Sequence, residues 1–234
     1  MAVDGRTVAY FYSGSGPSVV FESGLGDGYE PWQTVLTSVS AKAAVFAYDR
    51  AGYGGSTAVT GPRDGTHLVA ELQRNLDAAH VPAPYLLVGH SLGGPLVLLY
   101  ARLHPDAVAG VVLVDARPAQ FTDRCIAELG EAACVPSADL LAQLPPTQRA
   151  EFTALADTMK ELLAAPPFPE VPVVVLTHSK ASENASYDAL WSTMQDELAT
   201  ELSATHQVVA NTGHHIQRDA PSAVIDAITE LLTP

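Results

Sequence analysis

The sequence predicts an α/β fold, in which helices cover both faces of a mostly parallel β-sheet. Short apolar runs rich in Val and Leu alternate along the chain with longer segments of helical character. This alternation is typical of a sheet whose strands are buried on both faces. It stops between Asp115 and Val171, where glycine and proline divide the chain into short pieces. We therefore expect a core domain of residues 1–116 and 171–234 and a helical lid of residues 117–170.

The expected elements follow in order, each bounded by a turn signal. The segment SGSGP separates the first two strands, the third strand ends at Asp49 before the glycine-rich DRAGYGGS, and Pro82 and Pro84 end a helix. Helices are expected after Pro31 and at 66–80, 94–103 and 220–232. Strands are expected at 8–12, 19–21, 43–48, 85–88, 110–114, 173–176 and 207–210.

Composition and charge exclude several classes of partner. The chain has 12 Lys and Arg against 26 Asp and Glu, a formal charge of -14, which repels phosphate backbones, so no nucleic acid is expected. No apolar run approaches the roughly 20 residues that cross a bilayer, so no membrane span is expected. The opening MAVDGRTVAYFY lacks the features of a secretory signal. We expect a cytoplasmic protein, or a secreted one if the chain is a processed form, with no indication of oligomeric state.

The two cysteines, Cys125 and Cys134, flank Gly130, where a turn can form. Either they form a local disulfide or they are two small, partly buried thiols. No histidine pattern adjoins them, and the Cys/His spacings that zinc requires are absent. A catalytic role for the cysteines, a metal site and a cofactor are therefore not expected.

The segment Gly89-His90-Ser91-Leu92-Gly93 carries the strongest chemical signal. It has the pattern G-x-S-x-G between an expected strand and an expected helix. A nucleophile on such a sharp turn has a strained backbone, so small residues are needed beside it. This context predicts Ser91 as a nucleophile, whereas the alternative is a glycine-rich turn with an incidental serine.

A serine hydroxyl needs a base whose pKa lies near neutral pH, and histidine is the natural one. His214 follows the last expected strand, in Gly213-His214-His215-Ile216, where a loop can carry it over Ser91. His215 is the competing choice. His90 is expected to pack or hydrogen-bond beside the nucleophile.

Together the segments GHSLGG, DRAGYGGS, VLVDA and GHHIQRDAP resemble the α/β-hydrolase superfamily over nearly the whole chain outside the insertion. The resemblance implies the α/β-hydrolase fold, with His214 as base and with the Leu25 and Leu92 N–H groups as an oxyanion hole. It also places Gly24, Gly26, His90 and His215 near the substrate. Ser23 stands where relatives commonly have histidine, which leaves open how this loop is braced.

The triad acid has three candidates. An acid must orient the imidazole and stabilise its protonated form. Asp115 ends an expected strand at the position where some members of the superfamily carry the acid. Glu183 and Asp188 follow the next strand, where many relatives carry it, but both are displaced. We favour Asp115, while the alternative is that it only caps its strand.

The resemblance implies a serine hydrolase that cleaves an ester or related acyl bond in a small or medium substrate beneath the lid. One alternative is a cofactor-free lyase or perhydrolase that uses the same triad. The other is a non-catalytic ligand-binding protein of the same fold.

Overall fold

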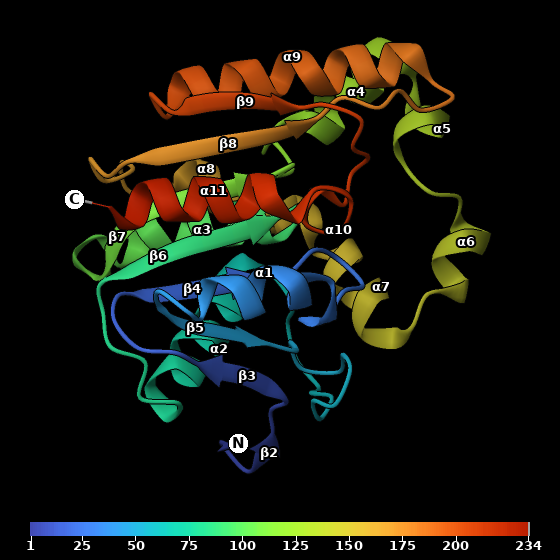
Figure 1. Ribbon diagram of the computed structural model, residues 1–234. Coiled ribbons are helices and arrows are strands. Elements are labelled where there is room, and N and C mark those ends of the chain that lie inside the picture. The colour runs from blue at the N-terminus through green and yellow to red at the C-terminus, as the bar shows by residue number, and fades with distance from the viewer. Residues whose placement is uncertain (234) are drawn as a thin grey trace.

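The computed structural model describes residues 1–233 and contains a seven-stranded sheet between two layers of helices (Figure 1). Along the sheet the strands lie in the order β3-β5-β4-β6-β7-β8-β9. Only β3 pairs antiparallel with its neighbour, so the predicted mostly parallel sheet is confirmed. The strand bounds are Tyr10–Ser13 (β3), Ser18–Glu22 (β4), Ala44–Tyr48 (β5), Tyr85–His90 (β6), Val108–Val114 (β7), Val173–His178 (β8) and Thr205–Val209 (β9).

The central strands are buried on both faces, as their continuous apolar sequences predict. Successive side chains of a strand point to opposite faces. In β6, Leu87 therefore joins the core on one side of the sheet, whereas Leu86 and Val88 join the core on the other.

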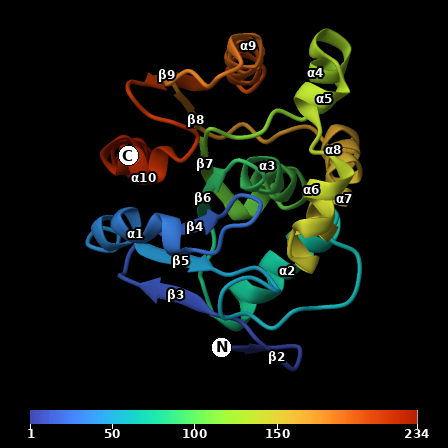
Figure 2. The same cartoon turned by 90° about the vertical axis from the view of Figure 1, so that its right-hand side faces the viewer.

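Figure 2 shows the sheet between its two helical layers. One layer contains α1 (Gln33–Val39), α10 (Ile216–Asp219) and α11 (Pro221–Leu232). The opposite layer contains α2 (Gly65–Ala78), α3 (Gly93–Leu103), α8 (Leu155–Ala164) and α9 (Ala185–Glu201). Within residues 1–233, no helix has the length and apolar character needed to cross a membrane.

The segment between β7 and β8 is helical, in line with its proline and glycine breaks. It contains α4 (Phe121–Leu129), α5 (Glu131–Cys134), α6 (Ala138–Gln143), α7 (Pro146–Thr153) and α8. In Figure 1, α5, α6 and α7 follow one another along the edge of the molecule where the parallel strands end. Cys125 and Cys134 form a disulfide that joins α4 to α5. Of the two alternatives for these residues, a local disulfide or two free thiols, the structure therefore has the disulfide.

Helix α9 is not predicted from the sequence. Its buried side includes the polar Gln195 as well as Trp191 and Met194, so the apolar period is weak. The NH₂ group of Gln195 donates to the Ala116 carbonyl at 2.6 Å, whereas its buried Oε1 has no hydrogen-bond partner within residues 1–233. The short strands β1 (Ala2–Val3) and β2 (Arg6–Thr7) and the helix α10 are likewise not predicted.

Candidate active site

Ser91 lies on a tight turn between β6 and α3. Its φ angle is +51°, a left-handed conformation that non-glycine residues rarely adopt. The turn packs closely against its neighbours: a Cβ atom on Gly93 would lie 2.2 Å from the Glu22 carbonyl oxygen, and one on Gly94 would lie 2.2 Å from Ala116 Cβ. Only glycine fits at these positions, which agrees with the nucleophile turn expected from the sequence.

His214 and Asp115 meet although 99 residues separate them in sequence. His214 is on the loop after β9, and Asp115 directly follows β7 with a φ angle of +46°. The distance from His214 Nδ1 to Asp115 Oδ2 is 2.5 Å, and Asp115 is fully buried. Among the three candidate acids, Asp115 is the one with a hydrogen bond to His214 in the part of the chain that the structure describes.

Asp115 also accepts hydrogen bonds from two residues that sequence reasoning missed. His178 Nδ1 lies 2.8 Å from Asp115 Oδ2, and the His178 backbone N–H donates to Oδ1 at 3.2 Å. Trp191 Nε1 donates to Oδ1 at 3.1 Å. Since β8 extends to His178, two residues past its predicted end, this histidine stands at the carboxyl edge of the sheet beside Asp115.

These contacts control the charge of the acid. Burial acts to raise the pKa of Asp115, but the hydrogen bonds from His178 and His214 outweigh it and leave that pKa below its ordinary value. The bond to Asp115 in turn raises the pKa of His178. Asp115 is therefore a carboxylate at neutral pH and can stabilise a protonated imidazole on His214.

Ser91 and His214 line one cavity of about 410 Å³ at the ends of the strands. Among residues 1–233 no hydrogen bond joins the Ser91 hydroxyl to His214, and catalytic bonds of this kind often tighten only when substrate is bound. The remaining lining residues are Arg117, His178, Lys180, Ala181, Ser182, Tyr187, Asp188, Trp191 and Gly213.

The loop after β4 lies against the nucleophile turn. A Cβ atom on Gly24 would lie 2.9 Å from His90 Nδ1 and 3.2 Å from Ser91 Cβ, so the loop contacts the turn at Gly24. Leu92 immediately precedes α3. Ser23 braces the loop, because its hydroxyl donates to the Gly28 carbonyl at 2.8 Å and accepts from Trp32 Nε1 at 3.0 Å. The hydroxyl thus supplies a support of its own at the position where relatives commonly have histidine.

A buried arginine supports the same loop by hydrogen bonds to its backbone carbonyl oxygens. Arg50 donates to the carbonyl oxygens of Ser23 at 2.6 Å and of Gly24 at 2.7 Å. Its charge is balanced by Glu22 at 2.8 Å and by Glu151 of α7 at 3.0 Å. Arg50 stands in DRAGYGGS, but nothing in the sequence shows that Glu151, 101 residues away, completes its site.

The other predicted site residues do not contribute a hydrogen bond to the His214 side chain within residues 1–233. Glu183 is exposed, and Asp188 lines the cavity but accepts a bond from the Ser182 N–H at 2.7 Å. His215 contacts Asp27, with Nε2 and Oδ2 3.3 Å apart, and His90 is buried. The residues that line the cavity do not include Gly24, Gly26, His90 or His215.

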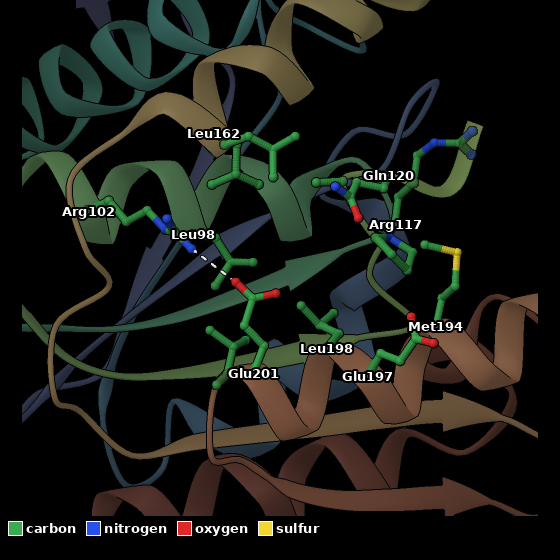
Figure 3. Close-up of a pocket in the computed structure, with 13 residues that line it drawn as sticks. Leu98, Arg102, Arg117, Gln120, Leu162, Met194, Glu197, Leu198 and Glu201 are labelled. Carbon is green, nitrogen blue, oxygen red and sulfur yellow. Dashed lines mark ion pairs between the residues drawn. The ribbon is translucent and has the colours of Figure 1, made fainter. Parts of the chain in front are cut away.

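Figure 3 shows a second cavity, of about 310 Å³, between α3, α8 and α9. Arg102 of α3 faces Glu201 of α9 across it, with 3.5 Å between their charged atoms. The cavity shares Arg117 with the first one but is lined by neither Ser91 nor His214. Ser91 and His214 therefore line the first of these two cavities and not the second.

Known proteins resemble this chain in sequence and in structure. A family model described as alpha/beta hydrolase fold matches residues 17–164. The uncharacterized protein YqjL of Bacillus subtilis is 27% identical over 218 residues, which cover 93% of this chain and 84% of that protein. The esterase Rv0045c of Mycobacterium tuberculosis is 26% identical over 277 residues, which cover 97% of this chain and 87% of that protein.

Among solved structures, an epoxide hydrolase named CorEH has a TM-score of 0.71 at 18% identity, covering 100% of this chain and 97% of that one. At this identity the likeness concerns the fold. The family match, which spans more than half of the sequence, agrees with the sheet order and the turn at Ser91. The chain belongs to the alpha/beta hydrolase fold family.

Proposed function

We propose that the protein is a serine hydrolase that cleaves an ester or related acyl bond through Ser91, His214 and Asp115. The observation that carries the proposal is the hydrogen bond from His214 to the buried Asp115 beside the cavity that Ser91 lines. The relative named as an esterase, which matches 97% of the chain, supports ester cleavage.

In the first half of the reaction, Ser91 Oγ attacks the substrate carbonyl carbon while His214 Nε2 takes the hydroxyl proton. Asp115 accepts from His214 Nδ1, so it fixes the tautomer in which Nε2 is free to act as a base. The N–H groups of Leu25 and Leu92 stabilise the oxyanion. As the carbonyl reforms, the bond to the alcohol breaks, and the alcohol leaves with the proton from His214.

In the second half, water attacks the acyl-serine ester and gives its proton to His214. The tetrahedral intermediate collapses, the acid product leaves, and the proton returns to Ser91 Oγ. No cofactor takes part in these steps. The cavity of about 410 Å³ suits a small or medium acyl substrate, and the helical segment 117–170 would act as a lid beside it.

The test is hydrolysis of p-nitrophenyl esters from C2 to C12 by the wild type, by Ser91→Ala and by the control Ser38→Ala, whose hydroxyl is exposed on α1. We expect the wild type and the control to cleave the esters equally, and Ser91→Ala to lose the activity. Activity retained by Ser91→Ala would show that Ser91 is not the nucleophile.

A second readout is labelling of the serine by a fluorophosphonate. Rapid labelling of the wild type without ester cleavage would overturn ester hydrolysis and favour a lyase or perhydrolase. Neither labelling nor cleavage would favour a ligand-binding protein.

A further inference from the structure

A second group of histidine and carboxylate side chains lies beside the catalytic one. Asp27, His90 and His215 each place one potential ligand atom within 4.8 Å of the other two. Asp27 comes from the loop after β4, His90 from the turn at Ser91, and His215 from the loop after β9. None of the three has a chemical role in the proposed hydrolysis.

His90 presents an unpaired nitrogen to this cluster. Its Nε2 lies 2.9 Å from the His214 carbonyl oxygen, which can only accept, so Nε2 carries the proton and Nδ1 has a free lone pair. Nδ1 is buried, has no hydrogen-bond partner within residues 1–233, and lies 3.9 Å from Asp27 Oδ2. A buried lone pair 3.9 Å from a carboxylate oxygen is unfavourable unless a hydrogen-bond donor or a cation bridges the two acceptors.

The catalytic cluster differs in this respect. There the Nδ1 atoms of both His178 and His214 are hydrogen-bonded to Asp115 Oδ2, so the carboxylate and the two nitrogens that face it are already satisfied. The unpaired nitrogen therefore belongs to the cluster around Asp27.

The spacing of the ligand atoms is close to that around a small divalent ion. At zinc–ligand bonds of about 2.0–2.1 Å, two ligands of a tetrahedral site are about 3.3 Å apart. Asp27 Oδ2 lies 3.3 Å from His215 Nε2, to which it is hydrogen-bonded without an ion, and 3.9 Å from His90 Nδ1, so an ion would replace that hydrogen bond and draw the His90 nitrogen closer. The His215 side chain is 40% exposed, so an ion can enter from solvent and a water can occupy a fourth position.

We propose that Asp27, His90 and His215 form a binding site for a divalent transition metal such as Zn²⁺. Two imidazoles and one carboxylate favour such ions over Ca²⁺ and Mg²⁺, which prefer oxygen ligands. The bond from His90 Nε2 to a backbone carbonyl is the support that a metal-bound histidine usually has. The ion links the oxyanion loop, the nucleophile turn and the loop that carries His214, and its binding does not depend on the proposed hydrolysis.

The first experiment is equilibrium dialysis of the untagged full chain against Zn²⁺. The variants are Asp27→Asn and His215→Gln, and the matched control is His178→Gln, which removes a histidine from the catalytic cluster. We expect one bound Zn²⁺ per chain in the wild type and in the control, and loss of that ion in both variants. The melting temperature should rise with Zn²⁺ only in the proteins that bind it. No Zn²⁺ bound by the wild type, or loss only in His178→Gln, would overturn the proposal.

The second experiment does not depend on the variants folding. Crystals of the wild type soaked in Zn²⁺ should show an anomalous peak within bonding distance of Asp27 Oδ2, His90 Nδ1 and His215 Nε2. A peak at Asp115 and His178 instead, or no peak, would show that these three residues do not hold a metal.

Discussion

Replacing Asp115 by Asn tests the acid of the proposed triad most directly. In the structure Oδ2 accepts from His214 and His178, while Oδ1 accepts from Trp191 and from the His178 backbone. Asparagine has the same shape, but one of its two positions is an NH₂ group that can only donate. In either orientation, that group faces two donors at this buried site, and the negative charge is gone.

The expected loss is large. An Asp→Asn change in the triad of a serine protease lowers kcat about 10⁴-fold, because the histidine takes the wrong tautomer. At about 1.36 kcal/mol for each factor of ten, this corresponds to about 5 kcal/mol of transition-state stabilisation. We expect a loss of the same order here, because His214 Nδ1 has Asp115 as its hydrogen-bond partner.

The assay is kcat for the best p-nitrophenyl ester, with circular dichroism to confirm that each variant is folded. Asp188→Asn and Glu183→Gln are the matched controls, since both residues follow β8 and neither is hydrogen-bonded to His214 in residues 1–233. We expect both controls to stay within a few-fold of the wild type. A folded Asp115→Asn variant within tenfold of the wild type, or a crippled Glu183→Gln, would refute the assignment.

Two further predictions concern buried charge and pH. Arg50→Met leaves the buried Glu22 without an ion-pair partner and the buried Glu151 with Arg63 alone, so urea unfolding should show a loss of about 3–5 kcal/mol. A loss below about 1 kcal/mol would contradict this. The bond to Asp115 raises the pKa of His178 in the folded protein. The pairing of His178 with Asp115 therefore stabilises the fold fully below the pKa of His178 in the unfolded chain, about 6.5, and this stabilisation is lost as pH rises through the pKa of His178 in the folded protein. His178→Gln should therefore lower the melting temperature more at pH 5.5 than at pH 9, and an equal loss at both would count against the pairing.

The sheet and the nucleophile turn are predictable because their signals are local. A strand buried on both faces is largely apolar, and β6 is continuously apolar from Tyr85 to Val88. The turn at Ser91 requires glycines close in sequence, so its pattern lies within a few residues. His214 is predictable for the same reason, because it lies on the loop directly after the last strand.

The supports of the site are not predictable, because each depends on residues that only the fold brings together. His178 and Trp191 reach Asp115 from 63 and 76 residues away, and Trp191 lies on a helix whose apolar period is hidden by polar residues. The ligand atoms around Asp27 come from positions 27, 90 and 215, so no spacing in the sequence indicates them.

The buried position of Glu151 has a consequence for how this protein evolves. Glu151 of the segment 117–170 forms ion pairs with both Arg50 and Arg63, and Leu162 of α8 is part of the main hydrophobic cluster. Removal or replacement of this segment as a whole would therefore disrupt the contacts that it makes with the rest of the protein. Any replacement must bring its own carboxylate to the same place, whereas the exposed α6 is free to vary in length and sequence.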